Sequence, residues 1–173
     1  LNPSNFNLSH NHQSFLARIK HLIESNEEKQ FVRHYNSKYG GKFPLWVMME
    51  LFSFGSLAFF YRDMKNGDKK ELADEYYDCS PNELDNWVFC LNELRNSCAH
   101  YCRLYGTSFP VEPKTPDDFP ITLSANVFGY IIVMKHIFHS HENWNERVVK
   151  PVSRILKKNA DVIRLSRHVG VEV

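Results

Sequence analysis

The sequence lacks the patterns that would predict strands, repeats or disorder. No stretch of useful length alternates apolar with polar residues, and no internal repeat or low-complexity segment is present. Hydrophobic residues make up 43% of the 173 residues and aromatic residues 14%, a composition typical of a globular protein with a packed core. The sequence therefore predicts a single all-α domain over residues 1–173.

Cysteine is scarce, and its spacing argues against disulfides. The chain has four cysteines, and its first residues show no signal peptide. Cys98 and Cys102 lie four positions apart, so on a helix their side chains would point in parallel, which is a poor geometry for a disulfide. We therefore expect reduced thiols and a cytoplasmic protein.

The sequence also lacks a hydrophobic run that could cross a membrane. The best candidate, residues 45–61, contains Glu50 and falls short of the roughly 20 residues that a membrane helix needs. We expect this run to form one long buried helix that begins at Pro44. No membrane contact is predicted.

Apolar spacing and turn residues predict the other elements. The expected helices span residues 14–25, 27–38, 69–77, 122–140 and 152–165. A turn is expected at Asn66-Gly67-Asp68, and an irregular loop is expected over about residues 106–121, which contain four prolines.

One more helix has the strongest start signal in the chain. Ser80 can cap it, Pro81 suits its first position, and Glu83 completes a capping box. We expect this helix to run over about residues 81–104. Its apolar stripe should be buried, and comprises Leu84, Trp87, Val88, Leu91, Leu94 and Cys98.

The last turns of this helix contain the sequence Arg95-Asn96-Ser97-Cys98-Ala99-His100. A guanidinium group can hold a phosphate through two parallel hydrogen bonds, and an imidazole exchanges protons near neutral pH. The pattern Arg-Asn-x-x-x-His resembles the signature of HEPN-domain ribonucleases. Together with the blocks at residues 31–35, 38–46 and 50–57, it resembles the Abi-like abortive-infection family of the AbiD and AbiF type. The resemblance covers about residues 30–110.

This resemblance implies a HEPN-type helical bundle that lacks part of the family's usual N-terminal region. It implies metal-independent cleavage of RNA through the 2′-hydroxyl, without a cofactor. His100 would exchange the proton, Arg95 would stabilise charge on the phosphate, and Asn96 would orient the histidine or bind the phosphate. The chain departs from many relatives at Tyr101 and Gly106, where they carry His and Asn.

Residues beside the motif offer cationic and stacking surfaces for RNA. Tyr101, Arg103 and Tyr105 are the candidates. Because the formal net charge is only +1, any surface that binds RNA has to be local. Basic residues near the C-terminus could also follow an RNA backbone, but on general grounds we interpret them as solvated helix residues: Lys150, Arg154, Lys157, Lys158, Arg164 and Arg167.

A single straight helix cannot aim Arg95 and His100 at one phosphate. Residues five positions apart are turned by roughly 140°, which would place Arg95 near the buried stripe and His100 on the polar side with Asn92, Asn96 and Arg103. Either the helix frays or bends near Ala99, or two copies of the helix meet and pool their motifs. The resemblance implies the second arrangement, and so a homodimer with a composite site.

Other interpretations of the same residues remain open. Arg95 and His100 could be a structural pair. Two groups of residues could together bind zinc: Cys98, His100 and Cys102, and His136, His139 and His141. No Cys-x-x-Cys pair exists, however, so packed thiols for the two cysteines and surface imidazoles for the second group are the simpler interpretation. A hydrophobic cluster is interpreted as core or dimer interface rather than a cofactor pocket, and comprises Trp46, Met48, Met49, Phe52, Phe54, Phe59 and Phe60.

The function predicted from the sequence is that of a toxin-like endoribonuclease in abortive infection, whose cleavage of host or phage RNA would halt an infected cell. A regulatory RNA or an antitoxin is a possible partner. The alternative is a non-catalytic HEPN module that binds structured RNA or a protein as a scaffold.

Overall fold

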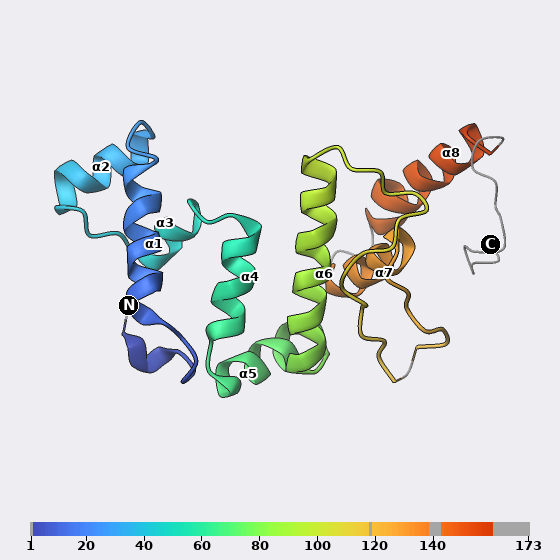
Figure 1. Cartoon of the computed structure of the whole chain (residues 1–173), viewed down its shortest axis with the longest axis horizontal. Helices are drawn as coiled ribbons and strands as arrows, with labels where there is room; N and C mark the ends of the chain where they lie inside the picture. Colours follow the sequence, from blue (N-terminus) through green and yellow to red (C-terminus); the bar gives the residue numbers. More distant parts are fainter. Residues whose placement is uncertain (1, 118, 139–142, 161–173) are drawn as a thin grey trace. The chain divides into compact units, whose positions relative to one another are not determined.

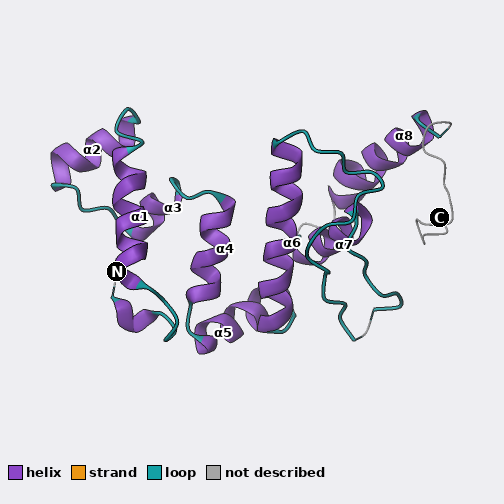
Figure 2. Cartoon of the chain, in the orientation of Figure 1, coloured by secondary structure: helices purple, strands orange, loops and turns teal. Residues whose placement is uncertain are grey.

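A computed structural model describes residues 2–117, 119–138 and 143–160. Every regular element within these ranges is a helix, and the only strand-type pairing there is an isolated bridge between Phe6 and Met64 (Figure 2). The all-α prediction is confirmed. None of the described helices is both long enough and apolar enough to cross a membrane.

The α-helices are labelled in Figure 1 and have the following bounds: α1 (His12–Glu24), α2 (Gln30–Tyr39), α3 (Leu45–Met49), α4 (Phe54–Asp63), α5 (Asn66–Tyr77), α6 (Pro81–Ala99), α7 (Val127–Ile137) and α8 (Lys150–Lys158). A 3₁₀ turn (Pro3–Asn5) precedes α1, and a π-helical turn (Asn145–Val149) leads into α8. The chain divides into two compact units, residues 1–134 and 135–173, each described by itself. A single domain stays a prediction.

Helix α6 is the centre of the first unit, and α4 and α5 both pack against it. Its inner face supplies Cys90 and Leu94 to a core that also contains Phe109, from the loop after α6, and Tyr130 of α7. A separate core lies among the first helices and is built on Val32, Met48 and Leu51. Burial of these side chains is the main force that holds the helices together, because most helices of this length are marginal alone.

Side-chain hydrogen bonds fasten the proline-rich loop to the helices on either side. Asn86 of α6 donates to the Glu112 carbonyl at 2.9 Å and accepts from the Lys114 amide at 2.7 Å. The Tyr130 hydroxyl donates to the Val111 carbonyl at 2.7 Å. The loop predicted over residues 106–121 is confirmed for the residues described, and these bonds satisfy backbone groups that no regular element pairs.

The prediction of one long apolar helix from Pro44 is wrong, because non-helical residues interrupt it between α3 and α4. Ser53 takes an extended conformation, and its side chain accepts a hydrogen bond from the Ser56 amide at 3.1 Å, so α4 starts afresh there. The break lets α4 turn toward α6. Gly55 faces α6 at the contact, where an added Cβ would lie 3.3 Å from Asn92 Oδ1.

Other predicted helix boundaries also differ from the structure, and three of them follow. Helix α5 begins at Asn66, so the expected turn is its first helical turn. Helix α7 begins at Val127 rather than at residue 122, since the Asn126 side chain accepts from the amides of Phe128 and Gly129 and caps the helix there. The last helix starts at Lys150, with Pro151 in its first turn, and residues 161–165 of the predicted helix lie outside the described ranges.

Candidate active site

The site predicted from the sequence lies at the C-terminal end of α6. The start of that helix is as predicted: Ser80 Oγ accepts from the Glu83 amide at 3.2 Å, and Glu83 Oε2 accepts from the Ser80 amide at 2.7 Å. The end comes earlier than residue 104, since His100 is already the C-terminal cap. The motif residues therefore occupy the last turn of α6 and the turn that follows.

Helix α6 ends in a Schellman motif, in which the chain reverses through a left-handed residue. The Cys102 amide donates to the Ser97 carbonyl at 2.8 Å, and the Tyr101 amide donates to the Cys98 carbonyl at 3.2 Å. Glycine usually occupies the left-handed position of this motif. Here the position is held by Tyr101, with φ 55°.

The conformation of Tyr101 is strained, because a left-handed backbone costs an L-residue about 1–2 kcal/mol. The residue is 96% exposed, so packing of its side chain does not offset that strain. Backbone strain of this kind concentrates at functional sites. The turn presents an aromatic ring to solvent directly after His100.

The three proposed catalytic residues lie near one another in sequence, but among the described contacts a side-chain hydrogen bond joins only Arg95 and Asn96, while the His100 amide donates to the Asn96 carbonyl at 3.0 Å as part of the helix. Arg95 Nη1 donates to Asn96 Oδ1 at 3.0 Å, which fixes the guanidinium beside the amide. His100 is exposed at the helix end, and within the described part of the chain no hydrogen bond or ion pair connects it to Arg95. Helix α6 continues to Ala99 and ends there, with His100 as its C-terminal cap.

Arg95 is exposed, and its predicted position near the buried stripe is wrong. The buried residues of α6 are Leu84, Trp87, Cys90 and Leu94. Phe109 and Tyr130 cover Cys90, so the buried face includes Cys90, which the predicted stripe omitted, while Leu91 is only half-buried. The stripe also stops at Leu94.

The residues proposed to bind RNA adopt different environments. Arg103 is exposed, but its Nε donates to the Tyr105 carbonyl at 2.9 Å, so its guanidinium lies against its own loop. The prediction that Arg103 continues the polar face of α6 is wrong, because α6 ends at Ala99, before this residue. Tyr105 is half-buried. Tyr101 is therefore the member of the three that is fully presented to solvent.

The basic residues near the C-terminus belong to the second unit. Lys150, Arg154, Lys157 and Lys158 are exposed, in agreement with solvated helix residues. Arg164 and Arg167 lie outside the described residues.

The four cysteines differ in burial. Cys98 and Cys102 are exposed, so the packed thiols predicted at these positions are wrong. Burial raises the pKa of the Cys90 thiol to about 11. Burial and, to a smaller extent, the negative charge of Glu83 raise the pKa of the Cys79 thiol to about 11. Both are therefore protonated at neutral pH and are poor nucleophiles.

A zinc site finds no support among the residues that the structure describes. They contain no group of three histidine, cysteine or acidic side chains that could hold a metal ion. His139 and His141 of the second predicted group lie outside the described residues.

Comparison with known families places this helix end in context. The chain matches the family model described as Abi-like protein over residues 1–106, which is more than half of its length. It belongs to the Abi-like protein family. The match begins earlier than the predicted resemblance over about residues 30–110, and it includes the whole block from Arg95 to Tyr105. No curated protein and no solved structure gives a significant match. Family membership indicates a role in abortive infection.

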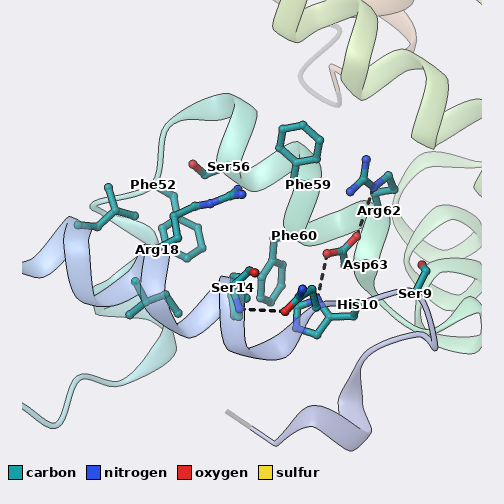
Figure 3. Close-up of a pocket in the computed structure, with 14 residues that line it drawn as sticks. Ser9, His10, Ser14, Arg18, Phe52, Ser56, Phe59, Phe60, Arg62 and Asp63 are labelled. Carbon is teal, nitrogen blue, oxygen red and sulfur yellow. Dashed lines mark hydrogen bonds and ion pairs between the residues drawn. The ribbon is translucent and has the colours of Figure 1, made fainter.

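A pocket of about 200 Å³, which no local pattern in the sequence predicts, lies between α1 and α4 (Figure 3). Phe52, Phe59 and Phe60 line it, although we had interpreted their hydrophobic cluster as core or interface. Arg18 and Arg62 line it as well, and neither had been singled out because the two lie in separate helices.

Proposed function

We propose that the chain is a metal-independent endoribonuclease of an abortive-infection system, with Arg95, Asn96 and His100 at its centre. The observation that carries this proposal is the position of the Arg-Asn-x-x-x-His block. It lies inside the matched family region and at an exposed, strained helix end, where the side chains are open to a large substrate.

The proposed chemistry uses the RNA itself as nucleophile. His100 exchanges a proton with the 2′-hydroxyl or with the leaving 5′-oxygen, and Arg95 stabilises the charge that grows on the phosphate. The 2′-oxygen bonds to phosphorus as the bond to the 5′-oxygen breaks. The products are a 2′,3′-cyclic phosphate and a 5′-hydroxyl, and DNA resists because it lacks the 2′-hydroxyl.

The geometry of α6 supports a site shared between two copies of the chain. Arg95 and His100 are turned by roughly 140° about the helix axis, and Arg95 is held beside Asn96 on its own side. A phosphate bound at one helix end can therefore contact either the Arg95 guanidinium or the His100 imidazole of that helix, but not both. In a symmetric dimer, Arg95 of one protomer faces the phosphate together with His100 of its partner.

Cleavage of a labelled structured RNA in excess EDTA tests the proposal. The parent protein should leave cyclic-phosphate ends, and His100→Ala should lose about 100-fold or more of the rate. His21→Ala is the matched control, because His21 is exposed near the end of another helix, α1. Cleavage of DNA at a comparable rate, or equal cleavage by His100→Ala, would contradict the proposal.

The alternative is a module that binds RNA or a protein without cutting. Two observations favour it: the net charge is only +1, and the Arg103 guanidinium is engaged with its own loop. Binding of the same RNA by the parent and by His100→Ala, with no cleavage by either, would favour this alternative.

A further inference from the structure

The pocket between α1 and α4 has an excess of positive charge. The guanidinium carbons of Arg18 and Arg62 lie 6.0 and 4.6 Å from the centroid of the Phe59 ring. Figure 3 shows the two side chains reaching toward that ring from either side. Among the described residues that line the pocket, Asp63 is the one carboxylate. Two guanidinium groups with a single counter-charge favour the binding of an anion.

The Arg62 side chain is held ready for such a ligand. Its Nε donates to Asp63 Oδ1 at 3.3 Å, while Asp63 Oδ2 lies 2.9 Å from Nδ1 of His10. The His10 side chain is only 2% exposed, and its ring stacks on Phe6 at 4.0 Å. Because Asp63 is fixed by a buried partner and accepts from Nε, it leaves the two terminal nitrogens of Arg62, which lines the pocket, available to a ligand.

Arg18 provides a second, uncommitted cation. It is exposed on α1 and forms no ion pair within the described part of the chain. A guanidinium that no carboxylate neutralises can form a fork of hydrogen bonds with a phosphate. Arg18 and Arg62 together are therefore suited to bind one phosphate through hydrogen bonds from both guanidinium groups.

The inner wall of the pocket is aromatic. The rings of Phe15, Phe52 and Phe60 contact one another at centroid distances of 5.9 to 6.4 Å. Such a wall accepts a flat ring, and Ser14 and Ser56 add hydroxyl-bearing side chains to the lining. At about 200 Å³ the pocket is smaller than the roughly 300–1,000 Å³ of sites for drug-sized ligands. It therefore suits one base rather than a dinucleotide.

We propose that this pocket binds one nucleoside monophosphate unit, with the phosphate on Arg18 and Arg62 and the base against the phenylalanine wall. The unit is either a free nucleotide or one unpaired nucleotide of an RNA strand. The proposal rests on the pocket alone and holds whether or not the end of α6 cleaves RNA.

Isothermal titration of the whole chain with AMP, GMP, CMP and UMP tests this proposal. At least one nucleotide should bind, and adenosine or inorganic phosphate alone should bind more weakly. Arg18→Gln and Arg62→Gln should each weaken binding by about tenfold or more. Lys20→Gln is the matched control, because it removes one cation from the same helix at an exposed position that does not line the pocket.

A short unstructured RNA, titrated in the same way, distinguishes the two sources of the ligand. Tighter binding of the RNA than of the mononucleotides, lost in Arg18→Gln, identifies an RNA strand, and the reverse order identifies a free nucleotide. Three results would overturn the proposal: no nucleotide binds, Arg18→Gln binds as tightly as the parent, or phenyl phosphate binds as tightly as the best nucleotide.

Discussion

The two ends of α6 differ in almost every physical respect. At its start a capping box closes the first turn, Trp87 is buried, and its indole donates to the Lys114 carbonyl at 2.8 Å. There the buried Lys69 of α5 also forms an ion pair of 2.9 Å with Asp85. At its end His100 is exposed, and the helix stops in a left-handed tyrosine.

Under the proposed function, this difference separates stability from activity within one helix. The start of α6 contributes two buried side chains, Leu84 and Trp87, and the ion pair between Asp85 and Lys69 to the first unit. The end contributes little to either, so residues there are free to serve chemistry without loss of the fold. Changes at the start should therefore alter stability, and changes at the end should alter activity.

The largest expected effect is on activity at the end of α6. Arg95→Ala should reduce RNA cleavage by about 100-fold or more, because the charge that develops on the phosphate loses its counter-charge. The free energy of unfolding should change by less than about 0.5 kcal/mol, because the side chain is exposed. Single-turnover cleavage and urea denaturation measure the two quantities. A large loss of stability would contradict the separation of roles.

The next effect is on stability at the start. Lys69 is 6% exposed, and Lys69→Ala leaves Asp85 partly buried without its partner. The free energy of unfolding should fall by about 2–3 kcal/mol. Lys70→Ala is the control, since the neighbouring Lys70 is exposed on the same helix. Equal urea midpoints for the two variants would show that the ion pair does not stabilise the contact between α5 and α6.

A smaller effect is expected from alkaline pH. Burial raises the pKa of Cys79 and Cys90 from 9.0 to about 11, so the folded chain holds these protons longer than the unfolded chain. The stabilisation is complete below pH 9 and is lost as pH rises toward 11. Burial raises the pKa of Tyr61 in the same direction.

Urea midpoints over this pH range measure that loss. Cys90→Ala should make the decline shallower, and Cys98→Ser, at the exposed end of α6, should leave it unchanged. The same decline in the parent, Cys90→Ala and Cys98→Ser would show that a group other than the Cys90 thiol causes the loss of stability.

The smallest effect is at the left-handed turn. Tyr101→Gly should raise the free energy of unfolding by up to about 1 kcal/mol, because glycine removes the steric strain but loses more conformational freedom on folding. Tyr101→Ala removes the same ring and keeps the strained Cβ, so it should give no gain. Thermal or urea unfolding of both variants is the measurement, and equal gains would exclude backbone strain as the cause.

The sequence predicted the start of α6 correctly because its signals are local. Ser80, Pro81 and Glu83 act within one turn, and each takes its expected position, as the cap, the first helical residue and the partner in the capping box. The end could not be predicted in the same way, because no glycine or proline marks it. A tyrosine in the left-handed position is not a stop signal that residue type reveals.

The errors over burial have a tertiary origin. The predicted stripe of α6 omitted Cys90, because residues that cover Cys90, such as Tyr130, come from a helix far along the chain. The pocket was missed for the same reason, since Arg18 and Arg62 meet at Phe59 only after α1 and α4 pack. Periodicity reveals which residues share a face, but not which neighbour covers it.

The central claim is that two exposed helix ends pool Arg95 and His100 into one site. Mixing inactive Arg95→Ala with inactive His100→Ala tests it most directly, because each mixed dimer then holds one complete pair. Half of the dimers are mixed and one of their two sites is intact, so about a quarter of the parent's RNA cleavage should return. Recovery near this level, absent from either variant alone, is the predicted result. No recovery, despite exchange of subunits between the two variants, would contradict the shared site.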